Sequence, residues 1–317
     1  MVDRPVLVTG AAGFAGSHVV EQLAGSCDIV AWARSAPPSD VARLARWTSI
    51  DLLDRDRVRR EVQAVRPAAV YHCAGASHVG ASWQDTAQPL ANNALATHYL
   101  LDALRRARVE ARVLVTGSAT VYAPSLSPLR EDDRLAPNSP YAVTKLAQEQ
   151  LVLREAADSG LGVIVARPFN HTGPRQRPDF AAPGMARQIA LIEHGALDPV
   201  IKVGNLDAER DLTDVRDTVR GYVLLMERGV PGTVYNVASG IGRSIRAVLD
   251  ALVQRSHVPV EIRIDSERLR PLDTPVIVGD ATRLRRATGW VPLIPFDRMI
   301  DDLLDYWRRT ARVSSER

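Results

Sequence analysis

Tyr141 and Lys145 stand four positions apart in a stretch, Ser139 to Lys145, that runs directly into a helical pattern. This spacing places a phenol and an ammonium on one face of a helix. A phenol with an ordinary pKa of ~10 is a weak acid–base catalyst at neutral pH, and a neighbouring ammonium would lower that pKa. Lys145 and Lys202 are the only lysines, so a compact ammonium stands at 145 in a chain that otherwise uses arginine. The pair predicts proton transfer at a bound substrate.

Ser118 and Thr120 are the hydroxyl side chains that could join this pair. Both follow the apolar run 112–116, which is typical of a buried strand. A hydroxyl at the carboxyl end of such a strand can point into a cleft and hydrogen-bond a reacting oxygen. From the residues alone, Ser118 and Thr120 compete for this role.

A strand, a glycine-rich turn and a helix follow one another at the start of the chain. The apolar run 6–8 ends at the turn, and apolar residues at helical spacing come after it. Gly10 allows a tight turn, Gly13 lets the backbone approach a pyrophosphate at the helix N-terminus, and Gly16 permits close packing of helix on strand. In this context the motif predicts a dinucleotide-binding turn.

Arg34 follows the second predicted strand, 28–33, where NAD-specific folds carry an acidic residue that holds the ribose hydroxyls. A guanidinium suits the additional 2′-phosphate of NADP. The alternative is a solvated loop arginine. The sequence therefore favours NADP(H), with NAD(H) as the other possible cofactor.

The next two predicted strands, 48–50 and 68–73, end in residues that could line a cofactor. These residues are Asp51, Leu52, Ala74, Gly75 and Ala76. His72 lies inside an apolar strand and is expected to be a core residue with satisfied hydrogen bonds. The polar loop 77–83 comes just past the carboxyl end of that strand, where ligands bind in open α/β sheets, so Ser77 and His78 are candidate substrate contacts.

Strands alternate with helical patterns at 55–65 and 93–108, and a sixth strand is predicted at 161–166. This alternation indicates an α/β fold with a Rossmann-type, doubly wound parallel sheet. We expect an NAD(P)-binding domain at 1–168, with a returning segment near 212–238, and a mainly substrate-binding domain at 169–317. Residues 310–317 are expected to be a frayed tail.

The bulk composition excludes several classes of protein. The 317 residues are 46% hydrophobic and 24% charged with a net charge of +3, and the arginines are scattered, so nucleic-acid binding is not suggested. No apolar run approaches the length of a membrane span. Cys27 and Cys73 lack metal-ligand spacing, so we expect no metal and two buried thiols in a reducing, cytoplasmic compartment.

Several motifs together resemble the extended short-chain dehydrogenase/reductases that act on nucleotide sugars, and cover nearly the whole chain. The first group of motifs is Thr9 to Gly16, Ser118 to Tyr122 and Ser139 to Lys145. A second group resembles the branch of GDP-mannose dehydratases and GDP-4-keto-6-deoxymannose reductases. It comprises Arg167 to Pro174, Val203 to Leu206, Arg210 to Asp217, Tyr235 to Gly240 and Leu269 to Pro271.

The resemblance assigns roles to the site residues. It selects Ser118 over Thr120 to hydrogen-bond the sugar 4-oxygen, has Tyr141 transfer a proton, and has Lys145 lower the pKa of Tyr141 and bind the nicotinamide ribose. Asn93 matches an asparagine that supports this lysine through water. Hydride passes between nicotinamide and sugar C4. Phe14, Ala15 and Pro168 join the cofactor contacts, and paired helices beginning near 93 and 141 imply a homodimer.

Dehydratases of this family carry a carboxylate just after the catalytic hydroxyl residue, and here the run Ser118-Ala119-Thr120 has none. Elimination would lack its acid–base catalyst. We therefore expect a reductase that converts GDP-4-keto-6-deoxy-D-mannose to GDP-D-rhamnose. The alternatives are an NAD-dependent 4-epimerase and, less favoured, a GDP-mannose 4,6-dehydratase or a non-catalytic NADP-binding regulator; the complete set of Ser118, Tyr141 and Lys145 argues against the regulator.

Polar residues inside the matched motifs are candidates for binding a nucleotide-sugar substrate, expected to be GDP-linked. Arg210 and Arg270 could hold the diphosphate, because forked donors suit phosphate oxygens. Asp211 and Asp214 are expected to orient Arg210 or to cap the next helix. The full set of substrate candidates is Ser77, His78, Ser118, Thr120, Asn170, Arg187, Val203, Asn205, Arg210 and Arg270.

Overall fold

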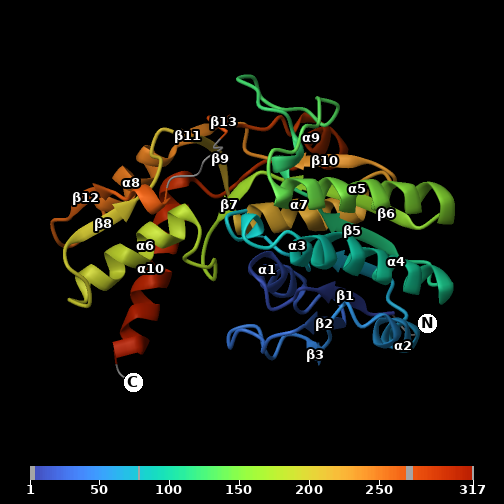
Figure 1. Cartoon of the computed structure of the whole chain (residues 1–317). Helices are drawn as coiled ribbons and strands as arrows, with labels where there is room; N and C mark the ends of the chain where they lie inside the picture. The colour runs from blue at the N-terminus through green and yellow to red at the C-terminus, as the bar shows by residue number, and fades with distance from the viewer. Residues whose placement is uncertain (1–3, 78, 269–273, 316–317) are drawn as a thin grey trace.

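The structure is a computed structural model that describes residues 4–77, 79–268 and 274–315, and a seven-stranded parallel sheet forms its frame (Figure 1). The strand order is β10-β6-β5-β4-β1-β2-β3. The strands are β1 (Val6–Thr9), β2 (Ile29–Ala33), β3 (Arg46–Ser49), β4 (Ala69–His72), β5 (Arg112–Thr116), β6 (Gly162–Pro168) and β10 (Val234–Val237). The predicted Rossmann-type, doubly wound sheet is confirmed.

Successive residues of β1, β2, β4, β5 and β6 enter two different hydrophobic cores. In β1, Leu7 packs in one core and Val8 in the other, and Val113 and Leu114 of β5 divide in the same way. Because side chains alternate across a strand, a sheet covered on both faces requires continuous apolar runs. This is why the inner strands of the sheet, such as β1, β2 and β5, consist largely of apolar residues.

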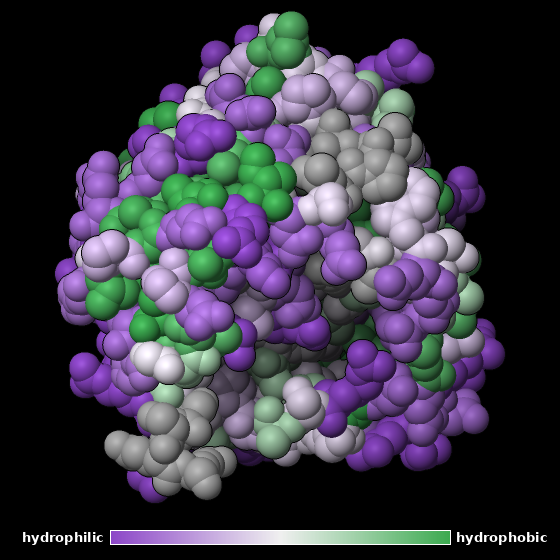
Figure 2. All heavy atoms as spheres, turned by 60° about the vertical axis from the view of Figure 1, so that its left-hand side comes forward, coloured by the Kyte–Doolittle hydropathy of each residue, from purple (hydrophilic) through white to green (hydrophobic). Residues whose placement is uncertain are grey.

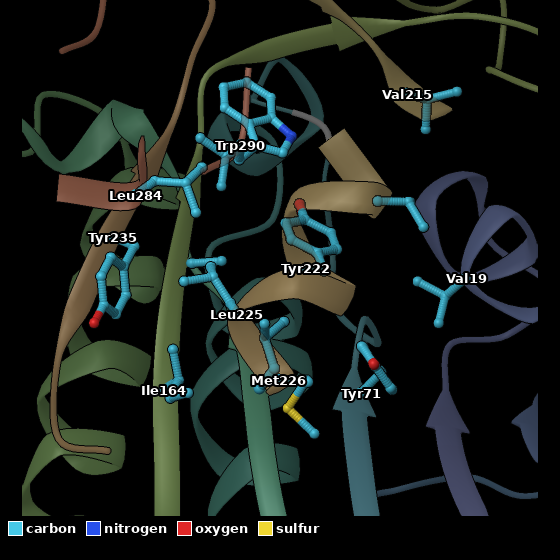
Figure 3. Close-up of a cluster of buried hydrophobic side chains, with 14 of the residues drawn as sticks. Val19, Tyr71, Ile164, Val215, Tyr222, Leu225, Met226, Tyr235, Leu284 and Trp290 are labelled. Carbon is cyan, nitrogen blue, oxygen red and sulfur yellow. The ribbon is translucent and has the colours of Figure 1, made fainter. Parts of the chain in front are cut away.

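Helices cover both faces of the sheet. One core receives apolar residues from α1 (Phe14–Leu23), α7 (Val215–Arg228) and α9 (Thr282–Thr288). The other receives them from α2 (Arg55–Val65), α4 (Ala96–Arg106) and α5 (Pro140–Ser159). Figure 3 shows the first core, where Tyr222 and Leu225 of α7 lie over the strands beside Trp290. The Trp290 indole donates to the Asp217 carbonyl over 2.9 Å, which satisfies its only polar atom.

Local sequence signals fix both ends of α5, the helix that carries Tyr141 and Lys145. The Ser139 hydroxyl accepts a hydrogen bond from the Ala142 amide, and Pro140 occupies the first turn, where its missing N–H costs nothing. Gly160 ends the helix in the left-handed conformation at φ +71°. Tyr141 therefore lies in the first turn and Lys145 in the second turn of a helix that is capped at both ends.

The remaining elements form a smaller unit with its own core. Apolar residues of α6 (Ala181–Glu193), α8 (Ile245–Val253) and α10 (Phe296–Ser315) pack together there. Its strands are β8 (Val200–Val203) paired with β12 (Glu261–Ile264), and β7 (Asn170–Thr172), β9 (Glu209–Asp214), β11 (Gly242–Ser244) and β13 (Val276–Ile277). Short helical turns complete the described chain: η1 (Ala81–Trp83), α3 (Ala87–Leu90), η2 (Ala91–Leu95), η3 (Ala119–Val121) and η4 (Ser266–Arg268).

The sequence predictions differ from the structure at several places. The expected frayed tail is wrong for residues 310–315, because α10 stays helical through Ser315 with its apolar stripe on the smaller core, and residues 316–317 lie outside the described part of the chain. Cys27 is exposed rather than buried, since it lies in the turn between α1 and β2. The segment 93–108 begins within a π-helical turn that α3 precedes. The domain limits 1–168 and 169–317 remain a proposal. Within the segment 212–238, which was expected to return to the first domain, β10 pairs in the large sheet and α7 packs against it.

No helix within the described part of the chain is both long enough and apolar enough to cross a membrane.

Candidate active site

The site candidates gather where three adjacent strands end. Thr9 of β1 lies beside His72 of β4, and His72 lies beside Val115 of β5. The carboxyl ends of parallel strands meet at one edge of a sheet, so the segments that follow these three strands converge there. Figure 2, in which the smaller unit is turned forward, shows the surface hollowed near its middle.

Three hydroxyl groups come together at this edge. The Ser118 and Thr120 hydroxyl oxygens lie 2.9 Å apart, and the Thr120 amide donates to the Ser118 hydroxyl over 3.2 Å. Ser118 also forms a hydrogen bond with the Tyr141 phenol. Ser118 and Thr120, the two candidates that follow β5, therefore belong to one cluster of hydroxyl groups. Ser118 connects this cluster to Tyr141.

The pKa of Tyr141 is raised to about 12, because burial disfavours the phenolate and the Ser118 hydrogen bond only partly offsets this. The expectation that Lys145 lowers this pKa is not met in the structure. The Lys145 ammonium donates instead to the Thr116 carbonyl at 2.7 Å and to the Gln148 side-chain oxygen at 2.9 Å. At neutral pH the phenol holds its proton.

Burial lowers the pKa of Lys145 to about 8, and the neighbouring Cys73 thiol counteracts part of this change. The side chain is 5% exposed. An ammonium with such a pKa is mostly charged at pH 7 and loses its charge in mildly alkaline solution. Lys145 is therefore a buried cation whose charge can respond to its surroundings.

The glycine-rich turn has the close packing expected of a dinucleotide site. Gly10 has φ +66°, and a Cβ there would stand 2.6 Å from the Ala74 Cα, so only glycine fits. Gly13 caps α1 without any side chain at the helix N-terminus, where Phe14 and Ala15 follow. A Cβ on Gly16 would collide with the backbone of Gly10. Together the turn and the helix N-terminus fit a pyrophosphate.

Asn93 organises the segment that faces this turn. Its side-chain oxygen accepts from the Ala76 amide at 2.8 Å, and its amide donates to the Thr144 hydroxyl at 2.9 Å. A Cβ on Gly75 would lie 2.5 Å from the Asn93 oxygen. Asn93 thus holds the segment 74–76 against α5 directly. π-Helical turns such as the one that contains it often occur at functional sites.

The other cofactor candidates lie in different environments. Arg34 is exposed after β2, where no acidic residue stands beside it in the sequence. Leu52 is buried in the core, and the Asp51 carboxylate accepts from the Leu53 amide at 2.9 Å, which fixes a turn. Pro168 ends β6 beside Val237 of β10.

The substrate candidates are distributed more widely. Ser77, Asn170 and Arg187 are exposed, and Asn205 accepts from the Asp207 amide at 3.0 Å. Arg210 donates to the Glu209 carbonyl at 2.8 Å. His78 and Arg270 lie outside the described residues.

Val203 does not have the expected exposure. Its side chain is buried in the smaller core, and its carbonyl accepts a hydrogen bond from the Asp265 amide at 2.8 Å. The Val203 side chain therefore faces the core of the smaller unit, and the contact of Val203 with substrate stays a prediction.

Asp211 and Asp214, which were expected to orient Arg210 or to cap the next helix, have different roles in the structure. Asp214 caps α7 by accepting from the Arg216 amide at 2.8 Å, as expected. Asp211 accepts from the amides of Ser239, Gly240 and Gly279 and from the Ser239 hydroxyl, so it holds loops together rather than orienting Arg210.

The structure adds residues that the sequence did not single out. The Ser82 hydroxyl accepts from the Tyr141 amide at 3.1 Å and donates to the Val79 carbonyl at 2.6 Å, which ties the loop after β4 to the start of α5. The Phe14 ring stacks on His171 with centroids 5.5 Å apart. Gln148 contacts Lys145 directly. The first two pairings do not follow from local spacing, whereas Lys145 and Gln148 are three positions apart on α5.

The sequence profile described as GDP-mannose 4,6 dehydratase matches residues 7–303. The chain belongs to this family. GDP-6-deoxy-D-mannose reductase of Pseudomonas aeruginosa is 35% identical over 98% of this chain and 99% of the relative. UDP-glucose 4-epimerase of Azospirillum brasilense is 33% identical over 90% of this chain and 87% of the relative.

A solved structure agrees with the fold of this GDP-mannose dehydratase family member. RMD from Pseudomonas aeruginosa complexed with NADPH matches with a TM-score of 0.86 at 33% identity, over 97% of this chain and 99% of the other. The expected resemblance to nucleotide-sugar short-chain dehydrogenase/reductases is thereby confirmed. The chain is an NAD(P)-dependent oxidoreductase of the extended short-chain type.

Proposed function

We propose that the chain reduces the 4-keto group of a nucleotide-linked 4-keto-6-deoxy sugar, converting GDP-4-keto-6-deoxy-D-mannose to GDP-D-rhamnose. The observation that carries this proposal is the hydroxyl cluster of Ser118, Thr120 and Tyr141 beside the buried Lys145. The run Ser118-Ala119-Thr120 contains no carboxylate, so it offers no acid–base group for dehydration.

The proton state of Tyr141 supports the reductive direction. Reduction of a ketone adds a hydride to carbon and a proton to oxygen, and NAD(P)H supplies the hydride when it is bound. A phenol whose pKa lies at about 12 is protonated at neutral pH and can give its proton to the 4-oxygen. Ser118 would hydrogen-bond the same oxygen, and its hydrogen bond to Tyr141 favours the phenolate that remains.

The chain's own residues would hold the cofactor in a defined way. The turn at Gly10 and Gly13 would take the pyrophosphate, and Lys145 has a third N–H donor that could reach the nicotinamide ribose. Asp51 and Leu52 would flank the adenine. NADP(H) is favoured because Arg34 can pair with a 2′-phosphate, and a relative was solved with NADPH.

Substrate binding would involve both units. Ser77, Asn170, Arg187, Asn205 and Arg210 are the described candidates, and arginine forks suit a diphosphate. A GDP-linked substrate is favoured because the relative from Pseudomonas aeruginosa acts, by its name, on a GDP-sugar. The free thiols of Cys27 and Cys73 accord with a reducing compartment, the cytoplasm.

A homodimer is proposed through the helices before and within the site. Leu90, Leu95, Val143 and Leu151 are between 41% and 50% exposed. They belong to α3, η2 and α5, which pack against one another. Four large apolar side chains on neighbouring helices form a surface that a second copy can bury.

A 4-epimerase is the second candidate, because a 33% identical relative has that activity by name. An epimerase retains NAD and returns the same hydride, whereas a reductase consumes NADPH. The test is therefore NADPH oxidation by purified protein with GDP-4-keto-6-deoxymannose, with NADH in parallel. Stoichiometric NADPH loss and a 4-hydroxy product support the reductase. No consumption, with NAD released on denaturation and interconversion of UDP- or GDP-sugars, would establish the epimerase instead.

A further inference from the structure

Lys145 is held from two sides, and one of its partners is a side chain. The ammonium donates to the Thr116 carbonyl at the end of β5 and to the Gln148 amide oxygen one turn further along α5. An ammonium can only donate, so Gln148 must present its oxygen to Lys145. Its NH₂ group then points the other way, where it donates to the Thr97 hydroxyl at 2.8 Å. The orientation of Gln148 is thus fixed by partners at both ends.

Thr97 of α4 anchors Gln148 because its hydroxyl is fully engaged. It donates to the Asn93 carbonyl at 2.6 Å and accepts from Gln148. The remaining contact, to His72 Nε2 at 2.7 Å, must then have the imidazole N–H as donor. His72 Nδ1 is left to accept from the Thr9 hydroxyl at 2.7 Å. Each of these contacts then pairs one donor with one acceptor.

The chain of contacts from Thr9 through His72, Thr97 and Gln148 to Lys145 is buried along its whole length. His72 is fully buried, and burial lowers its pKa to about 3, so it stays neutral. Thr9 and Thr97 are also fully buried, which leaves no exit to solvent. An enclosed network of this kind fixes positions, and its contacts at both ends of the Gln148 amide hold that side chain in one orientation.

We propose that Gln148 is a positioning residue that holds the Lys145 ammonium at the end of β5 and keeps it charged. The inference rests on the proposed function only in treating Lys145 as the active-site lysine. Hydrogen bonding to a charged form favours that form, so the Gln148 oxygen opposes the effect of burial on Lys145. The third N–H of Lys145 is then aimed by two fixed acceptors.

Substitutions at 148 should move the titration of Lys145 in opposite directions. Gln148→Leu removes an acceptor from a buried cation, so Lys145 should lose its proton at lower pH. Gln148→Glu places a carboxylate at the same point, so Lys145 should keep its proton to higher pH. The other titratable groups around the ammonium are His72 and Cys73 from β4 and the segment after it, and Tyr141 one turn earlier on α5. These groups are the same in both variants.

The titration can be read directly because the chain has two lysines. Protein labelled with ¹³C at lysine Cε gives two sets of NMR signals, and Lys202→Arg assigns them. We expect the Lys145 midpoint, at about 8 in the unmodified protein, to fall in Gln148→Leu and to rise in Gln148→Glu. Gln63→Leu makes the same substitution at an exposed position of α2 and should leave the midpoint unchanged. Thr97→Val, which removes the anchor of Gln148, should lower it as Gln148→Leu does.

Kinetics supply the second readout. In Gln148→Leu, kcat for NADPH-dependent reduction should fall about tenfold or more, and the alkaline decline of its pH profile should begin at lower pH. In Gln148→Glu, the activity should instead persist to higher pH than in Gln148→Leu. An unchanged Lys145 midpoint in both folded 148 variants would overturn the inference. If the midpoint moves as expected but no nucleotide sugar is turned over, the proposed function fails while the role of Gln148 stands.

Discussion

At the scale of single residues, the site contains two kinds of side chain: buried groups that the fold holds in place, and exposed groups that a ligand can contact. Tyr141 and Lys145 are 7% and 5% exposed, and burial moves both pKa values toward the neutral forms. Arg34 and Arg187 are exposed. The chemistry is therefore expected from the buried pair, and recognition from the exposed cations.

Tyr141→Phe removes the proton that we assign to the 4-oxygen. We expect kcat to fall by about 10²- to 10⁴-fold, the usual contribution of a general acid. NADPH affinity should change little, because the ring and its packing remain. Steady-state kinetics and fluorescence titration with NADPH measure the two quantities. Tyr306→Phe, far along α10, serves as the control, and comparable activity of Tyr141→Phe and wild type would contradict the assigned role.

Arg34→Asp should shift the cofactor preference of the enzyme from NADPH toward NADH. A charge-assisted hydrogen bond to phosphate contributes about 1.5–3 kcal/mol, so kcat/KM for NADPH should fall about tenfold to a hundredfold. The value for NADH should hold or rise, because the new carboxylate can accept from the ribose hydroxyls. Arg60→Asp, at another exposed position, controls for the change in net charge. Equal losses with both cofactors would show that Arg34 does not read the 2′-phosphate.

At the scale of elements, turns and caps place the residues. Gly10 and Gly160 both adopt left-handed backbone, at φ +66° and +71°. They differ in their surroundings, since a Cβ at 10 would meet Ala74 and a Cβ at 160 would meet nothing within 4 Å. The two glycines therefore separate backbone strain from close packing in a single experiment.

Gly160→Ala should lower the free energy of unfolding by about 1–2 kcal/mol through strain alone and leave NADPH binding intact. Gly10→Ala adds a clash with Ala74, in the segment that follows β4. It should therefore lower the free energy of unfolding further and abolish NADPH binding. Urea unfolding and NADPH titration measure both effects. If both variants lost the same stability and both bound NADPH, the packing argument at Gly10 would fail.

At the scale of the whole molecule, two units with separate cores meet across a polar connection. Arg175, in the segment after β7, pairs with Glu21 of α1 and with Asp40 after β2. The same arginine donates to His18 Nδ1 at 2.7 Å. The contact of Glu21 with His18, and then those with Arg175, hold the pKa of Glu21 down at about 2. Arg175 thus ties the segment after β7 to α1 and to the loop after β2.

The proposed homodimer can be tested on this scale. Val143→Glu with Leu151→Glu places two charges on the exposed apolar surface of α5, which should dissociate a dimer that buries it. Light scattering coupled to size exclusion should change from twice the chain mass to a single 34.6 kDa chain. Leu197→Glu with Ile264→Glu alters two exposed apolar residues of the smaller unit as the control. A wild-type protein that is already a monomer would refute the dimer.

The sequence by itself determined the parts of this protein that depend on local order. Glycine spacing, the hydroxyls after β5 and the Tyr141–Lys145 spacing are short-range patterns, and continuous apolar runs indicate a sheet buried on both faces. The core role of His72 also followed from its apolar strand, and it is confirmed.

Only the tertiary structure decided how these groups act on one another. Gln148 reaches Thr97 across 51 positions, Asn93 bonds Thr144 at the same separation, and Val203 turns into a core made by three helices. The direction of the Tyr141 pKa shift was also decided there, because desolvation depends on what surrounds the phenol in space. Spacing along the chain fixes which groups are neighbours on one element, whereas burial and long-range hydrogen bonds arise only when the elements pack.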